Sequence, residues 1–361
     1  MLFIYLNETI KSFAEYPGLQ CSIKNFYLEN HHEYDDSTLC SLFWMINRKD
    51  LNDEVFFMHL FDKLDKRIPE FDMKNFIYFV DGCSKKRNLI PNETIVKIQE
   101  KIKNLEGKYD SKDLSLVCNS FSKIHQEEVE DIEVFKVFER ELLRLGPDIR
   151  LDAILSFLFC INKVILRYPS DTPNMMENIL ISRASELTPE LLCKFLDVYS
   201  MLPAFYHYKN LYSVFENIIL DNPEEYFLKS KTRCLSIAHA YSKLKGFNKI
   251  IGLFIKYFPT IPEDIKNNSD SLGYFLYSML RKYPGQAYEA MLVQALFENS
   301  GKLSDLRKKK IIIGMIKRRS RNHFFLSNVQ KLGVFWSRDE IFYVTEYAKR
   351  LENLGLIKIN T

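Results

Sequence analysis

A short phrase that recurs seven times along this chain of 361 residues constrains its fold more than any other feature of the sequence. Each copy has an apolar or aromatic anchor residue followed by Ser or Asn, and in five copies Lys or Arg comes next. Successive anchors are 37, 38, 40, 38, 42 and 36 residues apart. A period of this length is typical of proteins built from stacked repeats of two helices. The anchors are Ile46, Cys83, Phe121, Ile161, Tyr199, Tyr241 and Tyr277.

The residues that precede each anchor predict a helix. Four and seven positions before it, the first six copies have apolar residues, such as Phe79 and Phe76 before Cys83. Positions separated by three, four and seven residues share one face of an α-helix, so these residues and the anchor predict a buried stripe. A second helix follows in each copy and is clearest at residues 131–145, where apolar residues recur at helical spacing.

A helix pair of this size cannot bury both of its apolar faces alone, so neighbouring pairs must stack. We therefore predict an all-α fold, an α-solenoid of about seven to eight helix-pair repeats of 36–42 residues. The expected organisation is an N-terminal cap at residues 1–34, the repeat solenoid at 35–301 and a basic C-terminal cap at 302–361. The 12 Gly and 12 Pro residues are too few for the many turns of a β protein.

The sequence contains no motif that predicts catalysis. The nucleotide-binding, zinc-protease and serine-hydrolase signatures are all missing, and no Cys or His spacing matches a zinc site. Six of the seven cysteines fall in predicted first helices, where a small apolar side chain packs readily, so we expect them to fill the core. No apolar run is long enough to span a bilayer. We therefore expect a protein that is not an enzyme and has no metal, cofactor or small-molecule substrate.

The polar residues after each anchor carry two further expectations. The Ser or Asn directly after it is expected either to bond to the backbone near the end of the helix or to permit close approach of a neighbouring helix. The next position is a cation in five copies, and equivalent positions of stacked repeats would place these cations in a row that could follow a phosphodiester backbone. A cation in the last helical turn also complements the helix dipole, and both interpretations stand. The five cations are Arg48, Lys85, Lys123, Lys163 and Lys243.

A second candidate site lies near the C-terminal end, where nine cations face the single acid Asp305 within residues 302–321. They surround the apolar run 311–316, which predicts a helix with one buried stripe and one cationic, exposed side. Nucleic acid is the favoured partner, ahead of an acidic protein or a membrane surface, and a solvated basic face without a partner is the remaining alternative. Phe324, Phe325 and Trp336 follow and could cap the core or stack on bases. The cations are Lys302, Arg307, Lys308, Lys309, Lys310, Lys317, Arg318, Arg319 and Arg321.

The repeat phrase, best seen in residues 113–124 and 233–244, resembles a known class of organellar repeats. It is similar to the heptatricopeptide-type repeats of apicomplexan RAP-domain proteins, which are related to the repeats of FAST-kinase-domain proteins. The resemblance implies a helix-pair fold and a role in mitochondrial or plastid transcript processing or in mitochondrial ribosomes. The chain departs from the pattern at its C-terminal end, where residues 348–359 match only the last helix and strand of a RAP domain.

The predicted function is that of a non-catalytic, RNA-associated helical-repeat protein of the mitochondrial matrix. The resemblance implies a structural component of the mitochondrial ribosome or of another organellar ribonucleoprotein. Its expected partners are RNA, mainly through backbone contacts, and neighbouring proteins of a large assembly. The alternative is a protein-binding scaffold or an accessory subunit of a mitochondrial membrane complex.

Overall fold

The computed structural model describes most of the chain up to residue 257 and shorter stretches beyond it. All regular structure in these stretches is helical, and they contain no strand, which confirms the all-α prediction. The described residues are 17–30, 33–48, 53–125, 131–164, 170–202, 208–242, 248–257, 293–294, 296–298, 301, 303–317, 328, 331, 345–346 and 349.

The chain divides into two compact units. The first is built from residues 1–179 with 202–206, and the second from 180–201 with 207–361. This division does not test the predicted boundaries of the caps and of the repeat region, at residues 34 and 301. These boundaries stay predictions.

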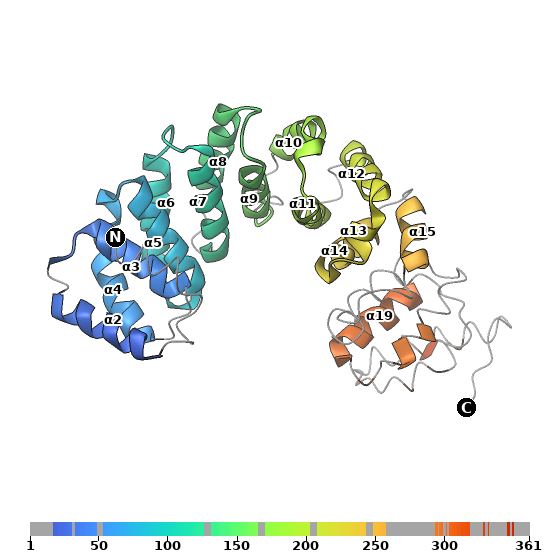
Figure 1. Ribbon diagram of the computed structural model, residues 1–361, viewed down its shortest axis with the longest axis horizontal. Coiled ribbons are helices and arrows are strands. Elements are labelled where there is room, and N and C mark those ends of the chain that lie inside the picture. Colours follow the sequence, from blue (N-terminus) through green and yellow to red (C-terminus); the bar gives the residue numbers. More distant parts are fainter. Residues whose placement is uncertain are drawn as a thin grey trace. The chain divides into compact units, whose positions relative to one another are not determined.

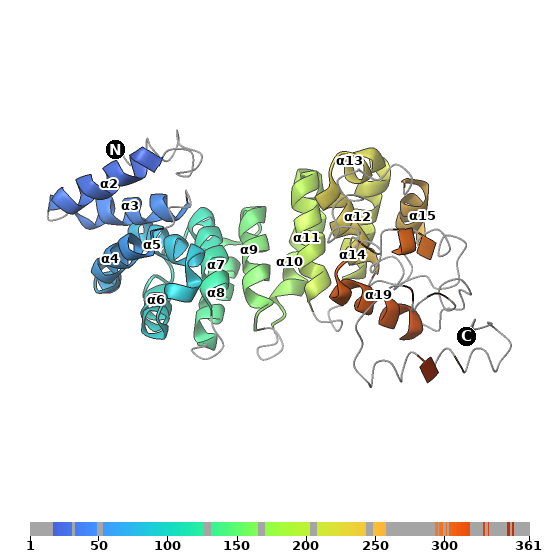
Figure 2. The same cartoon turned by 90° about the horizontal axis from the view of Figure 1, so that it is seen from below.

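The first unit consists of helices that alternate between two layers (Figures 1 and 2). The first helices of successive pairs, α3, α5, α7 and α9, each pack against the next, while the second helices α6 and α8 pack against each other behind them. The helices are α2 (Pro17–Asn30), α3 (Asp36–Arg48), α4 (Glu54–Asp65), α5 (Met73–Lys85), α6 (Asn92–Asn104), α7 (Ser111–Ile124), α8 (Ile132–Leu145), α9 (Leu151–Ile161) and α10 (Thr172–Ser182), with short 3₁₀ turns at Ile68–Glu70 and Arg87–Leu89.

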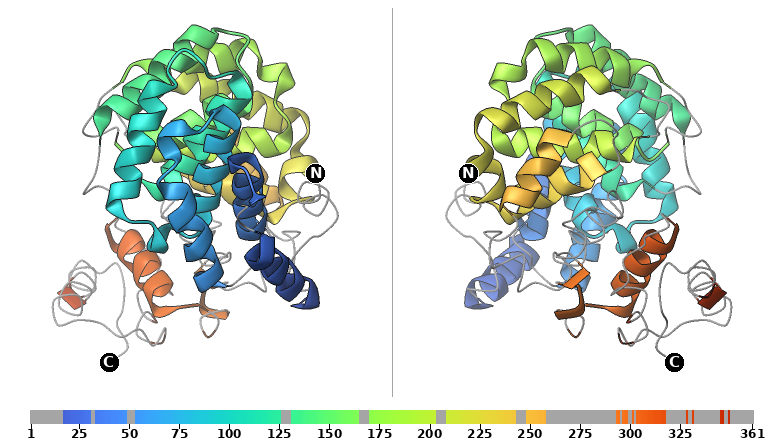
Figure 3. Two further views of the ribbon diagram at one scale, coloured as in Figure 1. Left: turned by 90° about the vertical axis from the view of Figure 1, so that its left-hand side faces the viewer. Right: turned by 90° about the vertical axis from the view of Figure 1, so that its right-hand side faces the viewer.

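The second unit is also built from packed helix pairs (Figure 3, right). Its first helices α11 and α14 pack against each other, and its second helices α12 and α15 are also in contact. The helices are α11 (Pro189–Met201), α12 (Lys209–Asp221), α13 (Pro223–Phe227), α14 (Lys231–Ser242), α15 (Asn248–Tyr257) and α19 (Asp305–Lys317), with a 3₁₀ turn at Ala184–Glu186.

The predicted anchors lie in the core. The six that the structure describes are at most 2% exposed, and so are the residues four positions before them. The seventh anchor, Tyr277, lies outside the described residues. Several helices begin where an Asp side chain accepts a hydrogen bond from the backbone of the first turn, as Asp72 does from Asn75 and Asp110 from Asp113. Each such cap stabilises its helix by about 1 kcal/mol.

The small polar residue after the anchor bonds to the backbone in four copies, at Asn47, Ser84, Ser122 and Ser200, which is one of the two roles expected for it. Asn47 Nδ2 donates to the Phe43 carbonyl at 2.7 Å, and Ser84 Oγ donates to the Asp81 carbonyl at 2.8 Å. Ser122 Oγ donates in the same way to the Asn119 carbonyl, also at 2.8 Å. These bonds satisfy hydroxyl and amide groups that are themselves buried, so a polar residue is tolerated next to the core.

The cysteine prediction is also confirmed. The six cysteines expected in first helices are buried, and Cys21 is exposed. The buried ones are Cys40, Cys83, Cys118, Cys160, Cys193 and Cys234.

Candidate nucleic-acid interface

The side of the first helices that faces away from the core carries the candidate site. Residues nine, five and two positions before the anchor and two after it lie roughly opposite the buried stripe, because each residue turns the helix by about 100°. We call the surface made by these positions on α3, α5, α7 and α9 the first-helix face. Because each first helix packs against the next in this unit, these positions form one continuous surface.

The predicted cation row lies on the first-helix face. Arg48, Lys85, Lys123 and Lys163 are all exposed, one at or just beyond the end of each of the four helices. None of the four is in an ion pair with any residue that the structure describes. Lys243, the fifth member of the predicted row, lies outside the described residues.

Two further cations of this face were not predicted. Lys74 of α5 and Lys112 of α7 stand nine positions before their anchors and are exposed, and within the described part of the chain neither has an ion-pair partner. The signal that could have found them is the angle around the helix, since position minus nine points in the same direction as position plus two.

Negative charge is sparse on this face. Asp152 of α9 is engaged by Arg150, whose Nη2 lies 2.7 Å from its Oδ2. Asp81 of α5 is the other acid, and both of its carboxylate oxygens accept hydrogen bonds. Six cations therefore meet one carboxylate that no cation of the described residues neutralises directly.

The cations are close enough to affect one another. The pKa of the Lys123 amine is lowered, mainly because burial of its stem removes water, while Asp81 acts in the opposite direction and Lys85 lowers the pKa further. Lys85 and Lys123 are therefore near enough for their charges to interact.

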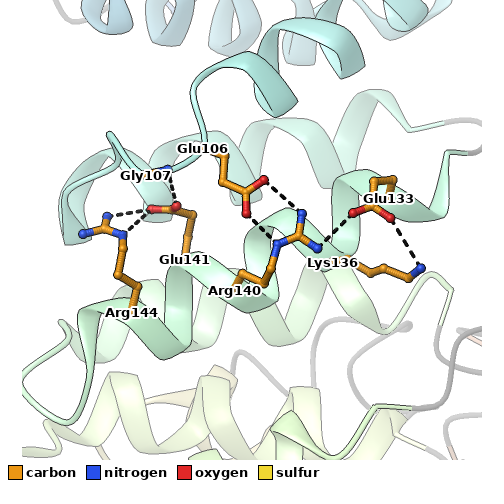
Figure 4. Close-up of polar contacts among 7 residues, drawn as sticks. All are labelled: Glu106, Gly107, Glu133, Lys136, Arg140, Glu141 and Arg144. Atoms are coloured by element: carbon orange, nitrogen blue, oxygen red, sulfur yellow. Dashed lines mark hydrogen bonds and ion pairs between the residues drawn. The ribbon is translucent and has the colours of Figure 1, made fainter.

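Most cations of α6 and α8 are arranged differently, because carboxylates pair with them, as Figure 4 shows for Lys136, Arg140 and Arg144 of α8. Arg140 of α8 bonds Glu106 and Glu133, with N–O distances of 2.9 Å to each. These contacts hold the pKa of both carboxyls below their usual range. Lys103 likewise contacts Asp131 at 2.9 Å. Most of the cations of α6 and α8 therefore have a carboxylate partner, whereas the four cations of the row have none among the described residues.

Two aromatic side chains interrupt the charges of the first-helix face. Trp44 of α3 and Tyr78 of α5 are partly exposed, and their rings stack with centroids 4.9 Å apart and planes inclined by 18°. Sequence reasoning missed both, although they stand two and five positions before their anchors and thus on the exposed side. A surface that combines unpaired cations with accessible rings can contact both the phosphates and the bases of a nucleic acid.

The C-terminal basic segment differs from the prediction at one residue. Lys308 was expected to be exposed but is only 8% exposed, and its amine lies 3.7 Å from Asp305. The reason is spacing, since Ile311, Ile312 and Met315 stand three, four and seven positions later and are buried on the same side of α19. Lys308 therefore belongs to the packed stripe.

The other cations of this segment are described only in part. Lys309 is half-buried and Lys310 is exposed. Arg307 and Lys317 belong to α19, but their side chains lie outside the described part of the structure. Lys302, Arg318, Arg319 and Arg321 lie outside the described residues altogether, as do Phe324, Phe325 and Trp336.

The described residues provide neither a group of metal ligands nor a helix that could cross a membrane. Among the described residues, no three His, Cys, Asp or Glu side chains are grouped so that they could share a metal ion. No helix in the described ranges has the length and apolar character needed to cross a bilayer.

The sequence matches no model of a known protein family, and no curated protein is significantly similar to it.

Proposed function

We propose that this protein binds RNA without catalysing a reaction, and that the first-helix face makes the main contacts. The observation that carries the proposal is the row formed by Arg48, Lys85, Lys123 and Lys163. These four side chains are exposed at equivalent places on consecutive helices and have no ion-pair partner within the described part of the chain.

The charge pattern favours a polyanion over a single acidic group. Adjacent packed helices lie about 8–10 Å apart, so the row offers one cation per helix over several helices. A phosphodiester chain has regularly spaced charges that such a row can follow, and binding it releases counterions that drive the association. Lys supplies three of the four cations, which suits point-charge contacts to phosphate and not geometric readout of bases.

The proposal also includes the repeat architecture, the basic cap and the assembly that were predicted from the sequence. The helix pairs of the two units continue as one α-solenoid of seven to eight repeats, and the basic cap adds contacts through residues such as Lys310. The resemblance to heptatricopeptide-type repeats supports a place in the mitochondrial matrix, within the mitochondrial ribosome or another organellar ribonucleoprotein. Neighbouring proteins of that assembly are then further partners.

The test compares two variants of the full-length protein that lose the same charge. The first replaces Arg48, Lys85, Lys123 and Lys163 by Gln. The control replaces four exposed lysines outside the first helices by Gln, namely Lys66, Lys108, Lys209 and Lys249. Affinity for two unrelated 20-nucleotide single-stranded RNAs is measured between 50 and 200 mM salt, after circular dichroism has shown that both variants are folded.

We expect the first variant to bind both RNAs more weakly and to the same degree, because phosphate contacts do not read sequence. Its log–log salt slope should fall by about 0.7 for each lost contact, or about 3 in total. The control should keep a slope within about one contact of the wild type. Equal affinity and slope in the wild type and the first variant would refute the proposal and favour the protein-binding scaffold.

A further inference from the structure

The stacked pair Trp44 and Tyr78 is part of a larger arrangement. Each ring also has a cation from its own helix against it: the Arg48 guanidinium carbon is 4.9 Å from the centre of the Trp44 ring, and the Lys74 amine is 5.7 Å from the centre of the Tyr78 ring. We call these four side chains the aromatic ladder. It joins α3 to α5 on the first-helix face, between the cations of neighbouring helices.

The ladder is held in place from behind. The indole N–H of Trp44 donates to Asp81 Oδ2 at 2.8 Å, and the hydroxyl of Ser120 donates to Asp81 Oδ1 at 2.9 Å. Asp81 thereby ties α3, α5 and α7 together and fixes the orientation of the indole ring. A ring that is already ordered loses little conformational entropy when a ligand stacks on it, which favours binding.

The rings are only partly covered, although they meet between two packed helices. The aromatic residues that serve the core alone, such as Phe43 and Phe79, are fully buried on the other side of the same two helices. Trp44 and Tyr78 instead remain half-buried beside Arg48 and Lys74, both of which are exposed. Aromatic and guanidinium planes are the groups on which unstacked bases pack in protein–RNA complexes.

We propose that the aromatic ladder binds an unpaired nucleobase, so that the first-helix face prefers single-stranded RNA with accessible bases to a duplex. This inference rests on the proposed function, because the surrounding cations must first hold the phosphates. The base stacks on the Trp44–Arg48 end of the ladder, and Lys85 and Lys123 contact the phosphates that follow. A paired base cannot take this position, since its faces are covered by its neighbours in the helix.

The experiment distinguishes the contribution of the bases to binding from the contribution of the phosphates. The full-length protein with Trp336→Phe leaves Trp44 as the only tryptophan of the chain, so its fluorescence reports on the ladder. The probes are a 12-nucleotide oligoadenylate and a 12-residue abasic ribose–phosphate chain, which have the same charges. Both are titrated against this protein, against its Trp44→Leu variant and against its Trp44→Phe variant, which keeps an aromatic ring.

We expect oligoadenylate to quench Trp44 and to bind about 5- to 150-fold more tightly than the abasic chain. Trp44→Leu should remove this difference while leaving the salt slope unchanged, and Trp44→Phe should retain most of it. A matching RNA duplex should bind Trp44→Leu and the parent equally well.

Equal binding of oligoadenylate and the abasic chain by the Trp336→Phe protein would overturn the ladder as a base site. So would a polyglutamate peptide that quenches Trp44 as strongly as oligoadenylate does. If the ladder fails in this way while the loss of the four cations still lowers the salt slope, the proposed RNA binding survives on phosphate contacts alone. The fluorescence titration needs no change at Trp44, so it remains decisive even if Trp44→Leu does not fold.

Discussion

Replacement of Gly82 by Ala tests the close packing of α3 against α5 that places the candidate site. Gly82 lies inside α5, and a Cβ atom added there would stand 2.6 Å from both Cδ1 and Cε1 of Phe43. The Phe43 ring cannot move aside easily, because it is fully buried and packs against Phe57 and Phe79 with centroid distances of 5.1 and 5.5 Å. The methyl group must therefore push the two helices apart or strain the ring.

The magnitude follows from two opposing effects. Gly→Ala in a helix interior stabilises by about 1 kcal/mol through helix propensity, and overpacking of a dense core costs about 1–3 kcal/mol. A contact at 2.6 Å with two ring atoms belongs in the upper part of that range, so the net expected loss is about 1–2 kcal/mol. Gly252 of α15 is the matched control, since nothing lies within 4 Å of an added Cβ there. Gly252→Ala should gain about 0.5–1 kcal/mol.

The assay is urea denaturation followed by circular dichroism, with each transition compared with the same transition of the wild type in case the two units unfold separately. Gly82→Ala should lower the free energy of unfolding, and Gly252→Ala should raise it. Phe43→Leu should also recover part of the loss in the Gly82→Ala background, because the smaller side chain makes room for the methyl group. If Gly82→Ala stabilised the protein as Gly252→Ala does, α3 and α5 could not be packed closely enough to bring the added Cβ within 2.6 Å of the Phe43 ring.

Three further predictions concern the core. Phe121→Ala should cost about 3–5 kcal/mol in the same assay, since the ring is fully buried, and a loss below about 1 kcal/mol would contradict its place in the core. Only Cys21 should react quickly with a thiol reagent such as dithionitrobenzoate, and the six buried cysteines should react only on unfolding. Burial raises the pKa of these six thiols above the ordinary value of 9.0, that of Cys234 to about 12. Their contribution to stability is therefore complete below about pH 9 and is lost as the pH rises toward 12, so urea midpoints that stay constant from pH 8 to 11 would contradict their burial.

The repeated elements could be predicted because one physical rule applies to each copy. A residue that must be buried in a stacked pair recurs at the same place, so the anchors and the residues four and seven positions before them reveal both the helices and their inner faces. The same rule applied to α19 would have placed Lys308 on the buried side. Lys308 was assigned to the exposed side because it belongs to a run of cations. Its helical spacing from Ile311, Ile312 and Met315 instead places it on their buried side.

The candidate site was predictable only in part. The cations after the anchors belong to the repeated phrase, and a self-comparison finds them. Lys74, Trp44 and Tyr78 do not recur in kind from one copy to the next, so the comparison passes over them, although their angle around the helix places them on the same face. The bond between Trp44 and Asp81 depends on how far α3 and α5 are shifted along each other, and this offset is set by packing across 37 residues of sequence.

The distribution of charge, and not its total, decides whether this protein can hold a polyanion. The chain carries 50 basic and 47 acidic residues, so a partner that sensed only the net charge of +3 would be attracted weakly. The acids are not spread evenly, however. Carboxylates such as Glu106 and Asp131 engage most of the cations of α6 and α8, while the four cations of the row on the first-helix face have no such partner within the described residues. Attraction at short range therefore depends on which cations remain unpaired, and Debye screening over about 8–10 Å at moderate salt limits the influence of the opposite layer. Two variants that lose the same charge from the two places should for this reason differ in RNA binding, which a net-charge account cannot produce.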